Sequence, residues 1–581
     1  MTLLRLKKYL LVYKIEYLWG FVALLLTVLG SVAVPWLLKY PIDLLKSEGV
    51  SHRFYGSVGL FLLVALVSGI FRYFMRKSLI GNSRKIECDL RNDLFAHLQK
   101  LSLSFYHQYR TGDIMARATN DINAVRNLLG PGIMYSFYTI IYTIFAVAMM
   151  LQINIKLTLL ALIPFPLVSF GVNRIMKHLY RWSELVQASF SDMTAHAQEN
   201  FSGIRVIKAY TQEQNQIRQF DRVNYKYLRQ NLVLSLFRGG MHACISLLAG
   251  IGMVVVLYFG GKDVIVQQIT LGEFVSFNTY LASLTWPMIA IGWVINIFQL
   301  GSASLDRLDE IFQTQPEIRD TDKTDFTIST VMGDLQLCHV YFKYHPDSDF
   351  VLRDINLEIP NGKFVAIVGA TGSGKSSLIN LIARLYDPQR GEIYLGGKPL
   401  HKIPLAVLRR SIGLVPQENF LFSETIAENI AFAEGDYQLE EVQNIARSID
   451  IDREIESFSK RYDTLLGERG INLSGGQKQR ISIARAALNH PKILLLDDSL
   501  SAVDTITERK ILQNLKSDFP KITKIIVSHR VTSLRDADLI VVVHDNHIAE
   551  QGRHEELLQA NGIYAELFYK QLIQEELEQI E

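Results

Sequence analysis

The sequence predicts two unlike parts: an α-helical membrane domain of six spans in residues 1–312, and an α/β domain in residues 333–581, joined by a polar linker at 313–332. Charge supports this division. The net charge is only +2, but residues 1–330 hold 32 Lys and Arg against 22 Asp and Glu, whereas residues 331–581 hold 28 against 36. Apolar residues make up 49% of the chain, which excludes a disordered or collagen-like protein.

The six predicted spans are apolar runs of about 20 residues, each long enough as a helix to cross a hydrocarbon core of roughly 30 Å. A helix of a soluble core would rarely be so apolar on every face. The spans are expected at about 18–38, 54–74, 132–152, 157–174, 240–260 and 275–299.

The loops between the spans predict the orientation. The two long loops, after the second and fourth spans, carry nine and ten Lys and Arg, while the three short loops together carry about five. By the positive-inside rule, the long loops and both termini face the cytoplasm. Residues 4–17 are basic and amphipathic, which suits a helix on the inner leaflet. The chain is therefore expected to be a multi-pass protein of the cytoplasmic membrane.

Inside the spans, His242 is the ionisable residue that we single out, and the scarcity of fixed charges argues against an ion-coupled carrier. Aromatic and amide side chains suggest a cavity for amphipathic molecules, although for any single one of them helix packing or bilayer contact is the more common explanation. These residues are Tyr135, Phe137, Tyr138, Tyr142, Phe145, Trp286, Trp293, Asn296 and Gln299.

The α/β domain opens with a nucleotide motif. The apolar strand 364–368 leads directly into Gly369-Ala370-Thr371-Gly372-Ser373-Gly374-Lys375-Ser376 and then into an apolar helix, which fits G-x-x-x-x-G-K-S in its strand–loop–helix context. Such a loop turns backbone N–H groups toward phosphate oxygens at a helix N-terminus. Lys375 can reach the β- and γ-phosphates, and Ser376 can ligate Mg²⁺. Ser377 completes the predicted nucleotide contacts.

Two further motifs follow. The strand 493–497 places Asp497 at its C-terminal end, where a carboxylate can hold the Mg²⁺ shell, and Leu473-Ser474-Gly475-Gly476-Gln477 opens a helix that offers a second anion site. Together these motifs resemble the ATP-binding cassette (ABC) family. The membrane half resembles the exporter branch, so the likeness covers nearly the whole chain.

The resemblance implies ATP and Mg²⁺ as cofactors, and no nucleic-acid partner. It implies that Tyr344 stacks on adenine, that Gln417 contacts Mg²⁺ and the attacking water, and that His529 contacts the γ-phosphate. Ser474, Gly475, Gly476 and Gln477 would contact a nucleotide across a cassette dimer. It further assigns Ser501–Asp504 to the D-loop and Glu468 to a loop facing the cytoplasmic helices, and it places coupling helices near 110–120 and 211–217.

One position departs from the family. The residue after the strand-end aspartate is usually a glutamate that polarises the attacking water, and here it is Asp498. Its side chain is one methylene shorter, a shortfall of about 1 Å that would slow a positioned base by roughly a hundredfold. The alternative is a conservative exchange that leaves a working base.

An intact signature beside a weakened catalytic site resembles the degenerate-site subunit of bacterial heterodimeric multidrug exporters. The resemblance implies ATP-driven efflux of amphipathic compounds by alternating access, with a second half-transporter supplying the catalytic glutamate. A homodimeric exporter or lipid flippase remains an alternative, as does an ATP-gated channel or regulator. The six spans exclude a soluble cassette protein, and the fusion of spans and cassette disfavours an importer.

Overall fold

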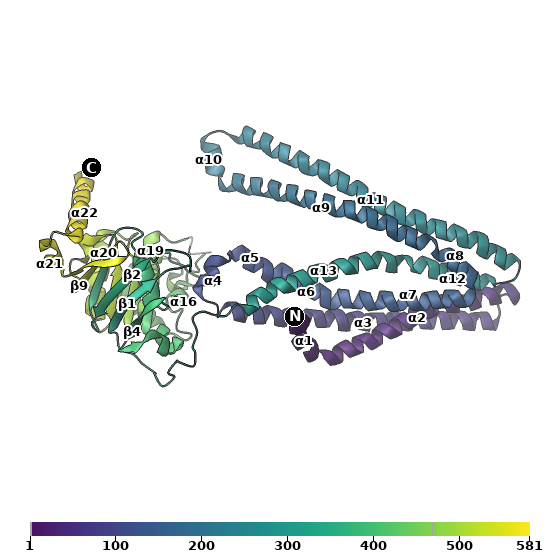
Figure 1. Ribbon diagram of the computed structural model, residues 1–581, viewed down its shortest axis with the longest axis horizontal. Helices are drawn as coiled ribbons and strands as arrows, with labels where there is room; N and C mark the ends of the chain where they lie inside the picture. The colour runs from purple at the N-terminus through teal and green to yellow at the C-terminus, as the bar shows by residue number, and fades with distance from the viewer. Residues whose placement is uncertain (1–2, 468–469, 471, 581) are drawn as a thin grey trace. The chain divides into compact units, whose positions relative to one another are not determined.

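The computed structural model describes residues 3–467, 470 and 472–580. The chain divides into two compact units (Figure 1). The membrane unit comprises Met1–Leu98 and Gly112–Gln313, and the ATPase unit comprises Gln99–Thr111 and Thr314–Glu581. A short segment from the first long loop thus belongs to the ATPase unit.

The membrane unit is built from helices alone in the residues that the structure describes. Residues 111–153 form one long helix, which includes two π-helical turns. In chain order the helices are α1 (Leu3–Val12), α2 (Lys14–Ser47), α3 (His52–Leu98), α5 (Thr111–Ala116), α6 (Ile122–Asn127), α7 (Ile133–Ile153), α8 (Ile155–Leu162), α9 (Pro164–Ser202), α10 (Ile204–Ala209), α11 (Glu213–Ile265), α12 (Leu271–Ser283) and α13 (Thr285–Gln313).

Four helices of the described chain are long and apolar enough to cross a membrane: Lys14–Ser47, His52–Leu98, Thr111–Ile153 and Leu271–Gln313. They contain four of the six predicted spans. The other two fall on α8–α9 and on α11, where several side chains, His242 among them, lie outside the described set. The total of six therefore stays a prediction.

The bundle is held by close helix contacts and by buried polar links. A Cβ added to Gly30 of α2 would lie 2.7 Å from the Ser68 Cβ of α3, so these helices approach closely only because Gly30 has no side chain. Near the cytoplasmic end, Asp121 accepts hydrogen bonds from Arg307 Nε at 3.0 Å and from Ser304 Oγ at 2.8 Å. This buried carboxylate ties the 111–153 helix to α13.

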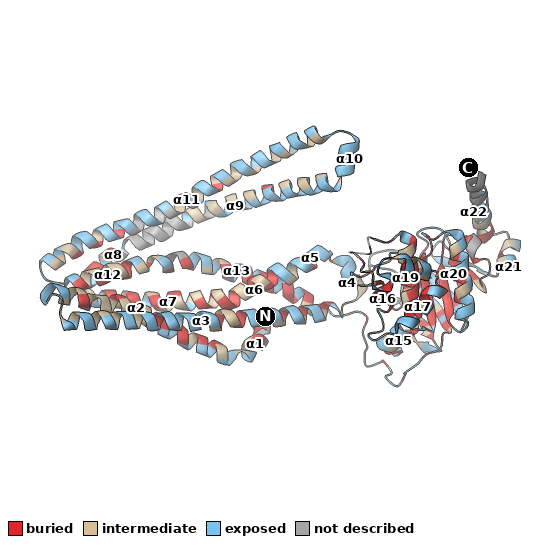
Figure 2. Ribbon diagram, turned by 180° about the vertical axis from the view of Figure 1, so that it is seen from behind, coloured by how far each residue is buried: buried red, intermediate tan, exposed pale blue. Residues whose placement is uncertain are grey.

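Helices α9 and α11 run side by side and are joined by the short α10 (Figure 1). Most of the described residues in this hairpin are exposed (Figure 2), and they include large apolar side chains such as Phe201, Tyr210 and Leu236.

Each cytoplasmic loop contains a short helix, α4 (Leu103–Gln108) in the first and α10 in the second. Both lie N-terminal to the segments 110–120 and 211–217, where the coupling helices stay a prediction. Thr111 and Glu213 begin the next long helices, which continue without a break into the apolar spans.

The ATPase unit contains two sheets. One is antiparallel, with strand order β2-β1-β4-β5, and the other has the order β10-β9-β3-β8-β7-β6, with all neighbours parallel except β10 and β9. The strands are β1 (Leu335–Phe342), β2 (Leu352–Ile359), β3 (Phe364–Val368), β4 (Arg390–Leu395), β5 (Lys398–Pro399), β6 (Ile412–Val415), β7 (Ile493–Asp497), β8 (Thr523–Val527), β9 (Leu539–His544) and β10 (His547–Gly552).

Strand β3 is buried on both faces, as a central parallel strand should be. Its residues alternate: Phe364, Ala366 and Val368 join one apolar core, while Val365 and Ile367 join the other. Helices cover the sheet, and they are α14 (Lys375–Ile382), α15 (Leu405–Ser411), α16 (Ile426–Ile430), α17 (Leu439–Ser448), α18 (Asp452–Ser457), α19 (Gly475–Leu488), α20 (Thr505–Asp518), α21 (His554–Gln559) and α22 (Ile563–Ile580).

Helix α4 packs onto this unit although its sequence lies between membrane helices. Leu103 contacts the second apolar core, and His107 Nδ1 and the Tyr386 hydroxyl lie 2.9 Å apart in a hydrogen bond. The backbone N–H of Ile318 donates to Ser102 Oγ at 3.0 Å. Polar and apolar contacts together fix α4 on the ATPase unit.

Candidate nucleotide site and membrane cavity

The nucleotide motifs converge because they follow adjacent parallel strands. Strands β3, β8, β7 and β6 are neighbours in the sheet, and the carboxyl ends of parallel strands meet at one edge. A pocket of about 270 Å³ opens there. It is lined by Val351, Thr371, Gly372, Gly374, Lys375, Ser376, Ser377, Gln417, Asp497, Asp498, Val527 and His529.

The phosphate loop has a backbone that only glycine accommodates. Gly374 has φ +101°, and a Cβ there would lie 2.7 Å from Leu352 Cδ2. Gly369 and Ala370 precede the lining residues and accept hydrogen bonds from Lys375 Nζ at 2.9 and 2.7 Å. Burial lowers the pKa of Lys375.

The loop also keeps an unused hydrogen-bonding group. Ser373 Oγ is buried and has no hydrogen-bond partner among the described residues. A buried hydroxyl without a partner is costly, and a phosphate oxygen would satisfy it. The residues of the loop therefore fit a bound polyphosphate.

The neighbouring oxygen atoms fit a magnesium ion. Ser376 Oγ donates to Asp497 Oδ1 at 3.1 Å, and Gln417 lines the same pocket. Hydroxyl, carboxylate and amide oxygens are ligands that Mg²⁺ accepts. Burial raises the pKa of Asp497, and the hydrogen bond from Ser376 opposes that rise. A divalent cation beside Asp497 would favour its charged form.

Asp498 directly follows β7 and has a left-handed backbone conformation, with φ +46°. Its backbone N–H donates to Val527 O at 2.9 Å, and its carbonyl accepts from Ser501 Oγ at 2.9 Å. The backbone is thus held without help from the carboxylate, which faces the pocket together with His529.

Tyr344 lies in a second pocket of about 470 Å³ in the same unit. Its hydroxyl forms a 2.8 Å hydrogen bond with Ser377 Oγ, and its ring meets Tyr386 edge-on with centroids 5.2 Å apart. Tyr344 is therefore tied to the helix that follows the phosphate loop.

The signature residues lie elsewhere in the unit and do not line the phosphate pocket. Ser474 caps α19: its Oγ accepts from the Gln477 N–H at 3.2 Å, while Gln477 Oε1 accepts from the Ser474 N–H at 2.9 Å. Gly475 is exposed. Gly476 is buried, and a Cβ there would lie 2.9 Å from Ala502 O. Ser474 and Gly475 are free to face another molecule, whereas Glu468 lies outside the described residues.

Sequence reasoning missed the side chains that brace the Ser501–Asp504 loop. Gln479 donates to Ser501 Oγ at 3.1 Å and accepts from the Ala502 N–H at 2.9 Å. Arg530 donates to Val503 O and to Glu508 Oε2, both at 2.8 Å. These links join the signature helix and the His529 segment to one loop.

We expect Arg530→Lys to destabilise this loop by about 1–3 kcal/mol, because the shorter side chain loses the guanidinium's hydrogen bonds to Val503 O and to the buried Glu508 carboxylate. The Glu508 side chain is only 1% exposed. The apparent melting temperature of the purified chain should fall. Arg509→Lys, an exposed exchange on α20 beside Glu508, is the matched control, and equal melting temperatures for the two variants would contradict the prediction.

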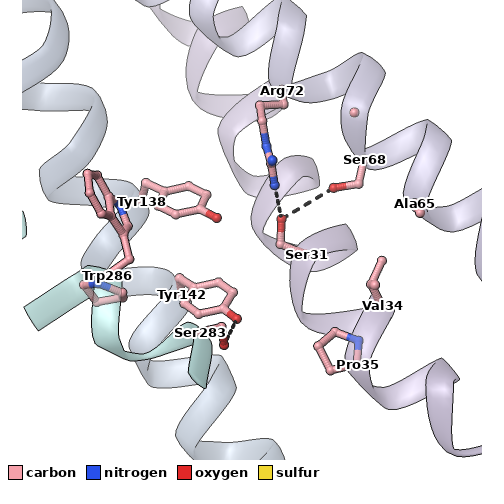
Figure 3. A pocket seen from close by; sticks show the side chains of 12 residues that line it. Ser31, Val34, Pro35, Ala65, Ser68, Arg72, Tyr138, Tyr142, Ser283 and Trp286 are labelled. Atoms are coloured by element: carbon pink, nitrogen blue, oxygen red, sulfur yellow. Dashed lines mark hydrogen bonds between the residues drawn. The ribbon is translucent and has the colours of Figure 1, made fainter. Parts of the chain in front are cut away.

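The membrane unit holds a cavity of about 490 Å³. Of the predicted cavity residues, Tyr138, Tyr142 and Trp286 line it (Figure 3). Tyr135 instead packs against Trp293, with ring centroids 5.1 Å apart. The remaining predicted residues, Phe137, Phe145, Asn296 and Gln299, are not among its lining residues.

Arg72 also lines this cavity, although it lies inside the predicted span 54–74. His242 is therefore not the sole ionisable residue of note within the predicted spans. The sequence did contain a signal for this cavity residue, a single arginine in the apolar run 54–74. It was overlooked because the run was judged by its average apolarity.

A phosphate loop, a carboxylate-ended strand and a capped signature helix, on a chain with membrane-spanning helices, define a membrane-bound P-loop ATPase. The family described as "ABC transporter transmembrane region" matches residues 17–288, and the family described as "ABC transporter" matches residues 352–501. The chain belongs to the ATP-binding cassette transporter family, on the exporter branch. Its ATPase domain binds ATP and couples ATP hydrolysis to transport across the membrane that the helical domain spans.

Relatives and a solved structure agree with this assignment. The probable multidrug resistance ABC transporter ATP-binding/permease protein YheI of Bacillus subtilis is 37% identical over 96% of both chains. The ATP-dependent lipid A-core flippase of Syntrophus aciditrophicus is 34% identical, over 87% of this chain and 84% of the flippase. The structure of a bacterial Atm1-family ABC exporter with ATP bound matches with a TM-score of 0.79 and 26% identity, over 96% of this chain and 99% of that chain.

Proposed function

We propose that this chain is one half of a heterodimeric exporter of amphipathic compounds, and that its own phosphate loop forms a slowly hydrolysing site. The observation that carries the proposal is Asp498, an aspartate at the position where the family usually has glutamate. Relatives named as a multidrug transporter and as a lipid flippase support drugs or lipid-like molecules as the cargo.

In this proposal, the phosphate-loop site of the chain binds ATP and Mg²⁺. Lys375 holds the β- and γ-phosphates, Ser376, Asp497 and Gln417 hold the ion, and Tyr344 stacks on adenine. Mg²⁺ would neutralise charge on the phosphates. Asp498 is the weak base, and His529 contacts the γ-phosphate. The remaining loop residues Gly369, Ala370, Thr371, Gly372, Ser373, Gly374 and Ser377 surround the phosphates with backbone and hydroxyl groups.

The exposed signature supports a role across a dimer. Ser474 and Gly475 face outward, and Gly476 and Gln477 hold the helix N-terminus that presents them. In the proposed assembly these four residues complete the competent site, whose glutamate belongs to the partner. ATP favours the closed dimer because it contacts both cassettes there, and a ligand shifts such an equilibrium only by its differential affinity. Hydrolysis at the competent site then permits reopening.

The test is ATP turnover by the purified chain in nanodiscs, with and without a co-expressed half-transporter that has glutamate after its strand-end aspartate. We expect turnover by the chain alone to be lower by about tenfold or more, because every site would then rely on an aspartate. Robust turnover by the chain alone would favour a homodimer with two Asp498 bases instead. The matched control is the partner with its glutamate replaced by glutamine, which should bring the pair down to the level of the chain alone.

A further inference from the structure

The cavity of the membrane unit combines one cationic side chain with several aromatic rings. Ser31 of α2 and Arg72 of α3 lie on one side. Tyr138 and Tyr142 of α7 point toward them from the other side, where Trp286 of α13 also lies (Figure 3). The Tyr138 and Tyr142 rings are nearly parallel, with centroids 5.8 Å apart. The cavity thus offers a charged wall and an apolar wall.

The cavity lies inside the predicted spans, because Tyr142 and Trp286 stand near the middles of 132–152 and 275–299. At a rise of about 1.5 Å per residue, Arg72 is roughly 30 Å along α3 from its first residue, His52. Ser31 is roughly 24 Å from Ser47, the last residue of α2. Ser31 and Arg72 therefore lie far from the α2–α3 connection, within the predicted spans 18–38 and 54–74.

The guanidinium of Arg72 has spare hydrogen-bonding capacity. Its Nη2 donates to Ser31 Oγ at 3.1 Å, and Ser31 Oγ in turn lies 3.5 Å from Ser68 Oγ. Among the residues that the structure describes, no carboxylate forms an ion pair with it. A guanidinium carries five N–H donors, and an intramembrane arginine normally faces water or an anionic group. Arg72 is exposed to the cavity, so water or an anionic group can reach its guanidinium.

We propose that Arg72 binds an anionic group of the transported molecule, while Tyr138, Tyr142 and Trp286 hold its apolar part. The cargo is then an anionic amphiphile, with a carboxylate, sulfate or phosphate at one end. Guanidinium binds such groups through paired N–H···O bonds, and the Ser31 hydroxyl can donate beside it. This inference rests on the proposed export of amphipathic compounds and narrows the cargo by charge.

A pair of fluorescent probes tests the proposal. The full transporter, in nanodiscs of neutral phosphatidylcholine, is titrated with 11-(dansylamino)undecanoic acid and with its methyl ester, which differ only in the charged group. The acid should bind about tenfold more tightly than the ester. Arg72→Gln should remove this difference and leave the affinity for the ester in place. Arg72→Lys should keep part of the difference, because lysine retains the charge without the planar fork.

Competition distinguishes an amphiphile from a free anion. Dodecyl phosphate should displace the acid probe, and inorganic phosphate should not. Displacement by inorganic phosphate at the same concentration would overturn the amphiphile part of the inference.

Arg53→Gln is the matched control for charge. Arg53 lies on the same helix, is 79% exposed and pairs with Glu48 at 3.3 Å, away from the cavity. Its exchange should leave both affinities unchanged. Equal binding of acid and ester by the unaltered protein would overturn the inference alone, as would an equal loss of both in Arg72→Gln. If neither probe binds the unaltered protein, both the inference and the proposed export of amphiphiles fail.

Discussion

Replacing Asp498 by glutamate should raise hydrolysis at the phosphate-loop site of this chain by about tenfold to a hundredfold, because the longer side chain restores the reach of the base. The backbone of Asp498 is held by Val527 and Ser501 without the carboxylate, so the exchange extends the side chain from a fixed point. The measurement is ATP turnover of the assembled transporter whose partner carries glutamine in place of its catalytic glutamate. With an intact partner, the gain in total turnover is limited to about twofold, because the partner's site already works.

One control and one further expected result accompany this prediction. Asp498→Asn should lower the residual turnover if the aspartate acts as a weak base. Asp498→Glu should also cost a few tenths of a kcal/mol of stability, since φ +46° suits aspartate better than glutamate. Turnover unchanged by the glutamate would mean that Asp498 does not limit hydrolysis at this site.

Lys375→Ala should abolish ATP binding at this site at micromolar nucleotide, a loss of roughly a hundredfold in affinity. The exchange removes the cation proposed to hold the phosphates and leaves the Gly369 and Ala370 carbonyls without their donor. Photolabelling of the assembled transporter with azido-ATP, followed by separation of the two chains, measures occupancy of this site.

Lys363→Ala is the matched control, since Lys363 is an exposed lysine just before β3, at the other end of that strand from the phosphate loop. In the Lys363 variant, nucleotide occupancy of the phosphate-loop site should equal that of the unaltered protein. Undiminished labelling of the Lys375 variant would contradict the assignment of the phosphate loop.

The sequence predicted best what is local. The phosphate loop is a strand, a glycine turn and a helix within 20 residues, so its pattern implies its geometry. Asp497 was placed correctly at the end of β7 by the same reasoning. The pairing of β7 with β8 and β6 then carries it to the phosphate pocket, and no local pattern encodes that step.

Contacts between segments that lie far apart in the chain could not be predicted from the sequence. Arg530 and Gln479 meet the Ser501–Asp504 loop only because the sheet brings three chain segments together. The position of the first short cytoplasmic helix depends on packing, since Leu103 needs the second apolar core to bury it. Arg72 is a different case: it was visible, but its cavity requires α7 and α13 from elsewhere in the chain.

The placement of α4 bears on how the protein can be dissected. The backbone passes between the two units at Leu98–Gln99, at Thr111–Gly112 and at Gln313–Thr314. A protease cut in the 313–332 linker therefore severs the one covalent connection to residues 333–581, and the noncovalent contacts of α4 then retain the cassette. A cassette expressed from residue 333 onward lacks Leu103 and His107, so it exposes apolar surface and leaves the Tyr386 hydroxyl without that partner. Its solubility and nucleotide affinity would describe a truncated fold, and work on isolated cassettes of this chain should supply residues 99–111 as a separate peptide.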